Sequence, residues 1–398
     1  MLLRRIRERV NPVTNEFVKR LNEVDQTTLT PLVHKMLENE SAEVVNWSYH
    51  PLDDNLAYES GHSYGLYRFV GTAQIEGKTV PWSLILKATG APFGSELPNH
   101  WQYWKREMLA YQSGLLDDLP GNLVAPRCFG TILYPVGECW IWIEDMIEEM
   151  ETWPLERYGL AARHLGQFNG AYLVGRSWPD EPWLSTGRVR DWLAESEATL
   201  RNLRSLSQHR LVQLWFKGDS IERTLRLWDE QAAFLEALDR LPRSLCHHDA
   251  FRRNLMARSG LDGQDQTIAI DWAIMGTGTI GEEIATLVGM SLRYLEVDGS
   301  QAKTLDDIVF EEYLRGLRDA GWDGDEKLVR FGFTASAALY IGVAEAGLTL
   351  DWALSDEAEA ECRQETGYSL EYVLGQQAPI QEYLLDLGDE ARMLMNSL

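Results

Sequence analysis

The stretch that decides the fold is Cys246–Met256, CHHDAFRRNLM, which follows directly on a predicted strand. In it, Asp249 and Asn254 lie five residues apart on one loop. The turn Ser259–Gln266, rich in Gly and Asp, predicts a hairpin whose second strand leads into Asp271. The sequence therefore predicts that two carboxylates and one amide meet at the end of this hairpin.

This set of oxygen-bearing side chains suits phosphoryl transfer, which needs a carboxylate to orient and deprotonate the attacking hydroxyl. Asp249 can supply that carboxylate. Asn254 and Asp271 can supply the few protein ligands that Mg²⁺ takes beside phosphate oxygens and water. Taken singly, Asp249 also fits a helix cap or Asx turn, and Asn254 fits a turn. The complete set favours the catalytic interpretation.

A lysine and a glutamate upstream fit the same chemistry. Lys87 closes the apolar run Leu84–Lys87, where a buried ammonium is costly unless it meets anions such as phosphates. Glu107 follows on a predicted amphipathic helix, in a position to pair with Lys87 and aim it. A plain surface glutamate is the alternative.

The order of predicted elements indicates two lobes. The predicted N-terminal elements are a helix at Thr30–Asn39 with Pro31 in its first turn, strands Glu43–Tyr49, Gly65–Ile75 and Val80–Lys87 with a turn at 76–78, a helix from Asn99 as N-cap to Tyr111 with Gly114 as stop, and a hairpin of Phe129–Tyr134 and Glu138–Glu144. The predicted C-terminal elements are helices Pro154–Leu173, Val189–Leu206, Leu211–Trp215 and Ser220–Leu241, a hairpin of Leu245–Ala257 and Thr267–Asp271, and further helices from Gly281 to the end.

These elements predict an α+β protein with three parts. Residues 1–26 form a helical N-terminal appendage, residues 27–146 form an N-terminal lobe of antiparallel strands with one key helix, and residues 147–398 form a mainly helical C-terminal lobe.

The order of the motifs resembles the aminoglycoside phosphotransferase and choline-kinase-like family of the protein-kinase-like superfamily. The matching pieces are Lys87, Glu107, the connector Trp140–Met146 (WIWIEDM), the motif from His247 to Asn254, and Ile270-Asp271-Trp272. The resemblance implies a two-lobed, protein-kinase-like fold and an ATP- and Mg²⁺-dependent kinase. It assigns Asp249 as the catalytic base, Asn254 and Asp271 as metal ligands, and Lys87 as the residue that grips the α- and β-phosphates.

The same resemblance implies a nucleotide site in the N-terminal lobe. The backbone around Glu144 and Met146 would hydrogen-bond adenine, and Ile85, with Ile143 and Met256, would pack on its faces. Core packing explains these apolar residues equally well. Ser63, in Gly61–Gly65, would cover the β- and γ-phosphates, although two glycines alone are a common turn signal.

The motif also departs from the family pattern. His248 stands where most antibiotic kinases carry glycine, and Glu282-Glu283 stand where relatives often have an aspartate before a helix. Trp272-Ala273 follows Asp271 in place of the Phe-Gly of eukaryotic protein kinases, and no activation segment follows. Protein substrates are therefore not expected. The family resemblance gives His247 a supporting role in the catalytic loop.

Composition narrows the function and the partners. With 37 basic and 61 acidic residues, the net charge is 37 − 61 = −24, which disfavours nucleic acid and anionic membranes as partners. The acidity fits either solubility or attraction of a cationic acceptor. Four cysteines show no metal or disulfide pattern, and we find no signal peptide and no uninterrupted apolar run that could span a membrane. A cytoplasmic location is expected.

We therefore expect a kinase that transfers the γ-phosphate of ATP to a hydroxyl of a small molecule that resembles an aminoglycoside, an amine or a sugar. The alternative is a pseudokinase that binds nucleotide and acts as a regulator or scaffold. The acceptor is expected against helices of the C-terminal lobe, whose tryptophans and acidic residues can bind amines or simply form a solvated face. The acidic residues are Asp191, Glu195, Glu197, Asp219, Glu222 and Asp229. Arg252 and Arg253 fit either phosphate binding or pairing with nearby acids.

Overall fold

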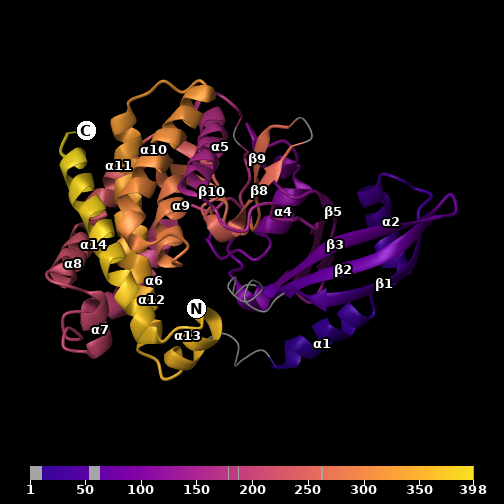
Figure 1. Ribbon diagram of the computed structural model, residues 1–398, viewed down its shortest axis with the longest axis horizontal. Coiled ribbons are helices and arrows are strands. Elements are labelled where there is room, and N and C mark those ends of the chain that lie inside the picture. The colour runs from indigo at the N-terminus through magenta and orange to yellow at the C-terminus, as the bar shows by residue number, and fades with distance from the viewer. Residues whose placement is uncertain (1–10, 53–62, 178, 187, 261–262, 398) are drawn as a thin grey trace. The chain divides into compact units, whose positions relative to one another are not determined.

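The computed structural model describes residues 11–52, 63–177, 179–186, 188–260 and 263–397 (Figure 1). The chain divides into two compact units. The N-terminal unit comprises Met1–Pro98, Gln102–Asp118 and Ala125–Ile147, and the C-terminal unit comprises Asn99–Trp101, Leu119–Val124 and Glu148–Leu398. Residues 1–10 of the predicted appendage lie outside the described residues.

Five antiparallel strands form the sheet of the N-terminal unit, in the order β1-β2-β3-β6-β5. They are β1 (Glu43–Pro51), β2 (Ser63–Ile75), β3 (Lys78–Gly90), β5 (Cys128–Tyr134) and β6 (Glu138–Glu144). The predicted turn between β2 and β3 is confirmed, because Glu76 and Gly77 have φ of 49° and 78°, as a two-residue hairpin turn requires. Gly137, with φ of 78°, closes the predicted hairpin of β5 and β6.

Two helices share the core of this sheet, α1 (Asn11–Asn22) and α2 (Gln26–Leu37). Phe17 of α1 is buried and stacks on Tyr64 of β2, with ring centroids 4.9 Å apart. Arg20 of α1 forms a salt bridge with the buried Glu138 of β6. The described part of the predicted appendage is therefore helical and packs on the sheet.

Helix α2 begins earlier than predicted. Asp25 caps it, since Oδ1 accepts a hydrogen bond of 3.0 Å from the Thr28 N–H. Pro31 consequently lies in the middle of the helix and not in its first turn. The prediction was wrong because it used the proline as the start signal and passed over the aspartate cap.

The predicted helix Asn99–Tyr111 is shorter in the structure, where α4 spans Arg106–Gln112. Asn99–Trp101 belong to the C-terminal unit, in which the Asn99 carbonyl accepts a hydrogen bond of 3.3 Å from the Thr186 N–H. Tertiary packing overrides the helical spacing here, and Asn99 is not an N-cap. Gly114 does end the helix region as predicted, with φ of 75°.

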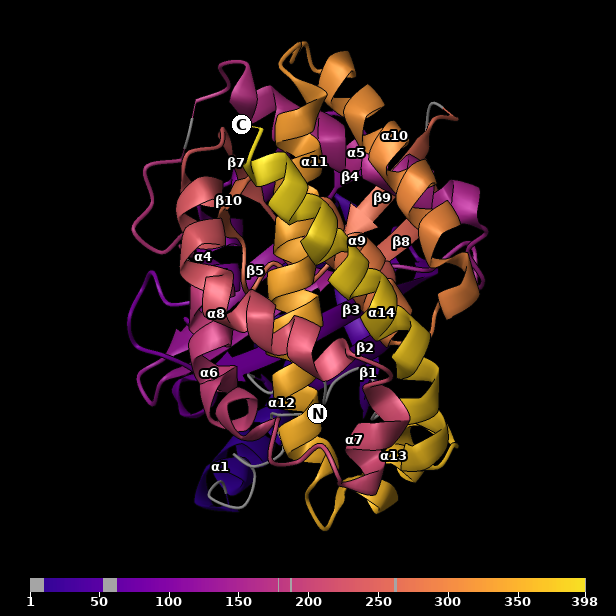
Figure 2. The same ribbon diagram turned by 90° about the vertical axis from the view of Figure 1, so that its left-hand side faces the viewer.

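The C-terminal unit is mainly helical, as predicted. Its helices are α5 (Leu155–Leu173), α6 (Arg188–Asn202), α7 (Arg210–Trp215), α8 (Ser220–Asp239), α9 (Glu282–Arg293), α10 (Ala302–Asp319), α11 (Glu326–Ser336), the π-helix η6 (Ala337–Glu345), α12 (Ala346–Ala353), α13 (Ala358–Thr366) and α14 (Leu370–Met395). Helix α14 runs beside α11 and η6 (Figure 2). Helices α5 and α10 pack closely, because a Cβ at Gly166 would come within 2.3 Å of the Tyr313 carbonyl.

Two small sheets are set among these helices. Their strands are β7 (Arg243–Cys246) with β10 (Gly276–Thr279), and β4 (Leu123–Val124), β9 (Asp265–Ala269) and β8 (Leu255–Ser259). The predicted hairpin therefore exists only as β8 and β9. The predicted single strand Leu245–Ala257 is wrong, because the loop between β7 and β8 interrupts it and β7 pairs with β10.

The continuous helical segment Glu326–Ala353 is long and apolar enough, by length and composition, to cross a membrane. Within the protein, 89% of its apolar window is buried, as the core helix of a folded domain also is. The expectation that no segment is long and apolar enough to span a membrane is corrected, since this helical segment meets both criteria.

Candidate active site

The loop 247–254 is held at both ends by the small sheets. Strand β7 ends at Cys246 and pairs with β10, and strand β8 begins at Leu255 and pairs with β9. A 3₁₀ turn, η4 (Arg252–Asn254), closes the loop. Because β9 leads into Asp271, the sheet of β8 and β9 brings this residue to the same end as Asn254, as predicted.

His247 supports the loop from within. Its ring is fully buried and lies 4.4 Å from the Trp272 ring, centroid to centroid. Nδ1 accepts a hydrogen bond of 3.1 Å from the Asp249 N–H, so Nε2 carries the proton and donates 2.9 Å to the Ile270 carbonyl. Burial lowers the pKa of His247 to about 4, which keeps the ring neutral. His247 therefore links the loop 247–254 to Ile270 by hydrogen bonds, and this geometry does not suit a catalytic acid or base.

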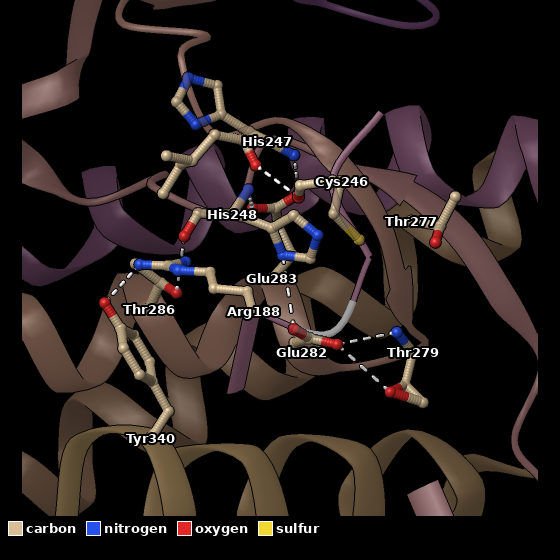
Figure 3. Close-up of polar contacts among 12 residues, drawn as sticks. Arg188, Cys246, His247, His248, Thr277, Thr279, Glu282, Glu283, Thr286 and Tyr340 are labelled. Carbon is tan, nitrogen blue, oxygen red and sulfur yellow. Dashed lines mark hydrogen bonds and ion pairs between the residues drawn. The ribbon is translucent and has the colours of Figure 1, made fainter. Parts of the chain in front are cut away.

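Glu283, at the start of α9, fixes the backbone of the loop (Figure 3). Its two carboxyl oxygens accept hydrogen bonds from the N–H groups of His247 (2.7 Å) and His248 (2.9 Å). Burial raises the pKa of Glu283 to about 7. His248 has φ of 69°, in the left-handed region where glycine has no steric cost, which fits the glycine that the family resemblance led us to expect at this position. Glu283, which differs from the family pattern, thus holds the backbone of the loop in which His248 also differs from it.

Asp249 and Asn254 face each other across the loop. Asn254 Nδ2 donates to Asp249 Oδ2 at 2.7 Å and to the Asp249 carbonyl at 3.0 Å. The Asn254 carbonyl accepts a hydrogen bond of 2.9 Å from the Ile270 N–H, which ties it to the residue before Asp271. The Asp249 side chain is 26% exposed, so it remains open to a reactant.

The residues present fit the predicted Mg²⁺ site. With Nδ2 bonded to Asp249, the Asn254 amide offers Oδ1 as its ligand atom, and Asp271 offers a carboxylate. Asp271 sits at φ of 60°, a strained conformation for a residue with a side chain. Among the described residues no group of three or more His, Cys, Asp or Glu side chains could hold a metal. A site with one amide and one carboxylate suits a metal that phosphates would also ligate.

In the N-terminal unit, Lys87 and Glu107 form the predicted pair. Lys87 Nζ lies 2.5 Å from Glu107 Oε2, and their side chains are 8% and 4% exposed. Lys87 lies in β3 between its partners Leu66 in β2 and Ile141 in β6, while Glu107 lies in the first turn of α4. The interpretation of Glu107 as a surface residue is therefore excluded. The role of Lys87 toward phosphates stays a prediction.

The predicted adenine residues lie on and just after the central strands. Ile85 pairs with Ile143 across β3 and β6, and both are buried. The Glu144 N–H already donates 2.9 Å to the Arg127 carbonyl, so this group is taken within the protein. Met146 is half-buried beyond β6. These placements leave the adenine assignment a prediction.

The predicted phosphate loop falls largely outside the described residues, since Gly61 and His62 are among those not described. Ser63 begins β2 opposite Thr89. Its predicted phosphate contact stays a prediction.

Arg188, at the start of α6, is a residue near Asp249 that sequence reasoning missed. Its Nη2 lies 3.6 Å from Asp249 Oδ1, and its side chain is 3% exposed. The guanidinium donates a hydrogen bond to the Tyr340 hydroxyl and lies 4.3 Å from the centroid of the Tyr340 ring (Figure 3). The signal in the sequence is weak, because an arginine at the first position of an amphipathic helix is ordinarily exposed.

Residues 155–324 match the model of the phosphotransferase enzyme family. This segment contains the loop 247–254 and Asp271. Over these residues the match supports the resemblance that the motifs predicted. No curated protein matches the chain.

The chain is also similar to solved structures. One is an amicoumacin kinase in complex with AMP-PNP, Ca²⁺ and Ami (14% identity, 90% of this chain and 97% of that chain, TM-score 0.48). Another is a spectinomycin phosphotransferase with ADP and spectinomycin (12% identity, 90% and 99%, TM-score 0.45). A third is a choline kinase from Cryptosporidium parvum (12% identity, 89% and 91%, TM-score 0.44).

In the C-terminal unit, several charged residues pair with one another. Arg252 donates to Glu148 at 3.0 Å, and Arg253 donates to Glu296 at 2.9 Å, which favours structural pairing for both arginines. Of the predicted acceptor-binding acids, Glu222 pairs with Arg204.

Glu197 pairs with Arg201, one turn along the same helix. These contacts fit the interpretation of Glu197 and Glu222 as part of a solvated face.

Asp191 and Glu195, on α6, lie in different surroundings. Trp101 Nε1 donates a hydrogen bond of 3.1 Å to Glu195 Oε1, and the Trp101 ring lies 5.2 Å from that of Trp192. His100 stacks beside Trp101 at 6.2 Å. This aromatic and acidic cluster, in which Trp101 is buried, begins one turn along α6 from Arg188.

Proposed function

We propose that this protein is a Mg·ATP-dependent phosphotransferase that transfers the γ-phosphate to a hydroxyl of a small molecule. The observation that carries the proposal is the arrangement of Asp249, held by Asn254, whose backbone is bonded to the residue before Asp271. The match of residues 155–324 to the phosphotransferase enzyme family supports the same reaction class.

In this proposal Asp249 orients the acceptor hydroxyl and takes its proton as the oxygen attacks the γ-phosphate. Asn254 and Asp271 hold Mg²⁺, which neutralises phosphate charge when bound. His247 and Glu283 keep the loop in the conformation that presents Asp249, through the backbone contacts at 2.7–3.1 Å. Each of these residues thus acts by position or by charge.

Lys87 would contact the α- and β-phosphates, with Glu107 holding its ammonium in place. The segment around Glu144 and Met146 would contact adenine, with Ile85 against the base, and Ser63 would cover the phosphates. A cytoplasmic location is part of the proposal, and four free thiols fit a reducing compartment.

The acceptor we propose is a hydroxylated amine. Asp191, Glu195 and Trp192 offer negative charge and an aromatic ring on α6, the helix that begins with Arg188 beside Asp249. The buried Trp101, from the segment Asn99–Trp101, bonds Glu195 and packs on Trp192. An ammonium group is attracted by both features.

The test is a screen for ADP release with Mg·ATP and a panel of amino alcohols, aminoglycosides and neutral sugars. The wild-type protein is expected to respond to at least one hydroxylated amine. Asp249→Ala should abolish turnover and retain Mg·ATP binding by calorimetry. The matched control is Asp239→Ala, an exposed aspartate of the same unit that pairs with Arg190. Tight Mg·ATP binding without turnover for any acceptor would favour the pseudokinase instead.

A further inference from the structure

Arg188 places a buried positive charge beside the proposed base. Its side chain is 3% exposed, and its Nε–H is buried without a hydrogen-bond partner among the described residues. An arginine in such a place costs several kcal/mol unless an anion compensates its charge. Among the described residues, Asp249 is the carboxylate with which it forms an ion pair.

Tyr340 holds this arginine but does not compensate its charge. Its hydroxyl accepts a hydrogen bond from Arg188 Nη2, and burial raises the pKa of Tyr340, so the phenol stays neutral. The Arg188 guanidinium also lies over the rings of Tyr340 (4.3 Å) and Trp192 (5.7 Å), which fixes its plane. The guanidinium therefore keeps its charge and lies within ion-pair distance of Asp249, whereas the buried Glu282 and Glu345 feel this charge at longer range.

The backbone that presents Tyr340 is unusual. Residues Ala337–Glu345 form a nine-residue π-helix between α11 and α12, and Tyr340 lies within it. π-helical turns are rare and occur frequently at functional sites. A π-helical turn holds more residues than an α-helical turn, so the residues after it point in other directions than they would in a regular α-helix. The helical distortion thus coincides with the residue that anchors Arg188.

The two oxygens of Asp249 are held from different elements. Asn254, on the same loop, donates to Oδ2 at 2.7 Å. Arg188, from α6, faces Oδ1 at 3.6 Å, which is too long for a hydrogen bond but close enough for a strong ionic attraction in a buried setting. Two anchors on opposite oxygens restrict rotation of the carboxylate about its Cβ–Cγ bond.

We propose that Arg188 is a positioning residue for Asp249 and that Tyr340 positions Arg188 in turn. The inference rests on the proposed phosphotransfer function. A general base must meet the hydroxyl within hydrogen-bond distance and at the correct angle, and small displacements are costly in rate. Arg188 keeps the Asp249 carboxylate in that orientation before the acceptor arrives.

The first experiment measures the coupling of Arg188 and Asp249 without using activity. Urea unfolding of the wild type, Arg188→Met, Asp249→Asn and the double variant forms a double-mutant cycle. We expect the effect of the double variant on the unfolding constant to differ about tenfold from the product of the two single effects, or ~1.4 kcal/mol in free energy. Additivity within twofold would overturn the ionic link even if the protein is an active kinase.

The second experiment measures turnover with the acceptor that responds best in the ADP-release screen, or with water as acceptor if none responds. Arg188→Met should lower kcat about 30-fold and leave the KM for Mg·ATP within about twofold. Arg188→Lys keeps the charge and should therefore have a kcat about threefold or more above that of Arg188→Met. Tyr340→Phe should lower kcat about threefold to tenfold.

The matched control is Arg190→Met, which removes an exposed arginine two residues along α6 whose partner is Asp239. Its kcat should stay within about twofold of the wild type. Equal kcat values for Arg188→Met and Arg190→Met would overturn the positioning role. A wild type that is inactive like Asp249→Ala would instead refute the proposed function, and the unfolding cycle would still decide the ionic link.

Discussion

The pairs Lys87–Glu107 and Arg188–Asp249 each join a buried cation to a carboxylate, but they differ in how closed they are. In the N-terminal unit, Lys87 and Glu107 lie 2.5 Å apart and both side chains are less than 10% exposed. In the C-terminal unit, Arg188 is equally buried, yet Asp249 lies 3.6 Å away and is 26% exposed. The closed pair fixes a cation, whereas the open pair leaves a carboxylate oriented and accessible to a reactant.

The largest effect is expected from breaking the closed pair. Lys87→Met removes the cation beside the buried Glu107 carboxylate, which should lower the free energy of unfolding by about 3–5 kcal/mol. Arg188→Met should cost less, about 1–3 kcal/mol, because Asp249 can turn to water. Urea unfolding of both variants checks the order. Lys87→Met should also weaken Mg·ATP binding about tenfold or more, measured by calorimetry.

An equal loss of stability in Lys87→Met and Arg188→Met would show that the two pairs are equally closed. Glu107→Gln, which leaves Lys87 without its anion, is the matched control from the other side of the closed pair.

The next effect comes from two buried histidines, His247 in the catalytic loop and His164 on α5. Burial lowers both pKa values to about 4 from an ordinary 6.5. Because the unfolded chain binds these protons first, stability is complete above pH 6.5 and is lost as the pH falls from 6.5 to 4, by up to about 3 kcal/mol for each histidine. Urea unfolding across this range measures the slope.

His247→Asn and His164→Asn should each remove the part of the acid loss of stability that comes from the replaced histidine. Of the two variants, His247→Asn alone should lower turnover. His164 contacts Thr267 at 2.8 Å and touches no residue of the loop 247–254 through that bond. An unchanged acid slope in both variants would contradict the assignment of neutral buried rings.

A smaller effect is expected at Glu283, which holds the backbone behind the open pair. Glu283→Gln replaces one of two acceptors with a donor that faces a backbone N–H, at a cost of about 2 kcal/mol. Turnover should fall about tenfold as the loop loosens. The matched control, Glu282→Gln, changes contacts with the Thr279 N–H (2.9 Å) and the His248 side chain (3.4 Å) but none with the loop backbone, so turnover should fall less than in Glu283→Gln. Equal kinetic losses would argue against a specific role for Glu283.

The smallest effect is expected at the acceptor surface. Glu195→Gln should raise the KM of an amine acceptor about threefold and leave that of a neutral sugar unchanged, because an exposed carboxylate contributes less than 1 kcal/mol. Steady-state kinetics on one acceptor of each kind checks this. Glu197→Gln, which removes the partner of Arg201, is the control and should move neither KM.

Local spacing made much of this site predictable from the sequence. Asp249 and Asn254 share one loop, and the β8–β9 hairpin carries Asp271 to the same end. The Lys87–Glu107 pair was also predictable, since a lysine in an apolar strand needs an anion and Glu107 lies on the amphipathic helix predicted to follow. The strand turns at Gly77 and Gly137 followed from glycine where φ is positive.

Contacts between distant segments were not predictable. Arg188 lies 61 residues before Asp249, and no periodicity links the start of α6 to a loop between two short strands. Pairing of β7 with β10 joins Cys246 to Gly276, which lies outside the hairpin that the sequence predicted. Asn99–Trp101 have helical spacing, but their packing in the C-terminal unit overrides it. These contacts depend on tertiary structure, which local propensity does not predict.

The central claim is that Asp249 directs a hydroxyl of the acceptor onto the γ-phosphate. Phosphorus NMR of Mg·ATP with the responding acceptor tests it most directly, because it distinguishes a phosphomonoester from inorganic phosphate. The account predicts a phosphomonoester signal that grows as ADP forms with the wild-type protein and is absent with Asp249→Ala, while Mg·ATP binding is retained. Equal phosphomonoester formation by Asp249→Ala, or inorganic phosphate as the sole product of the wild type, would contradict it.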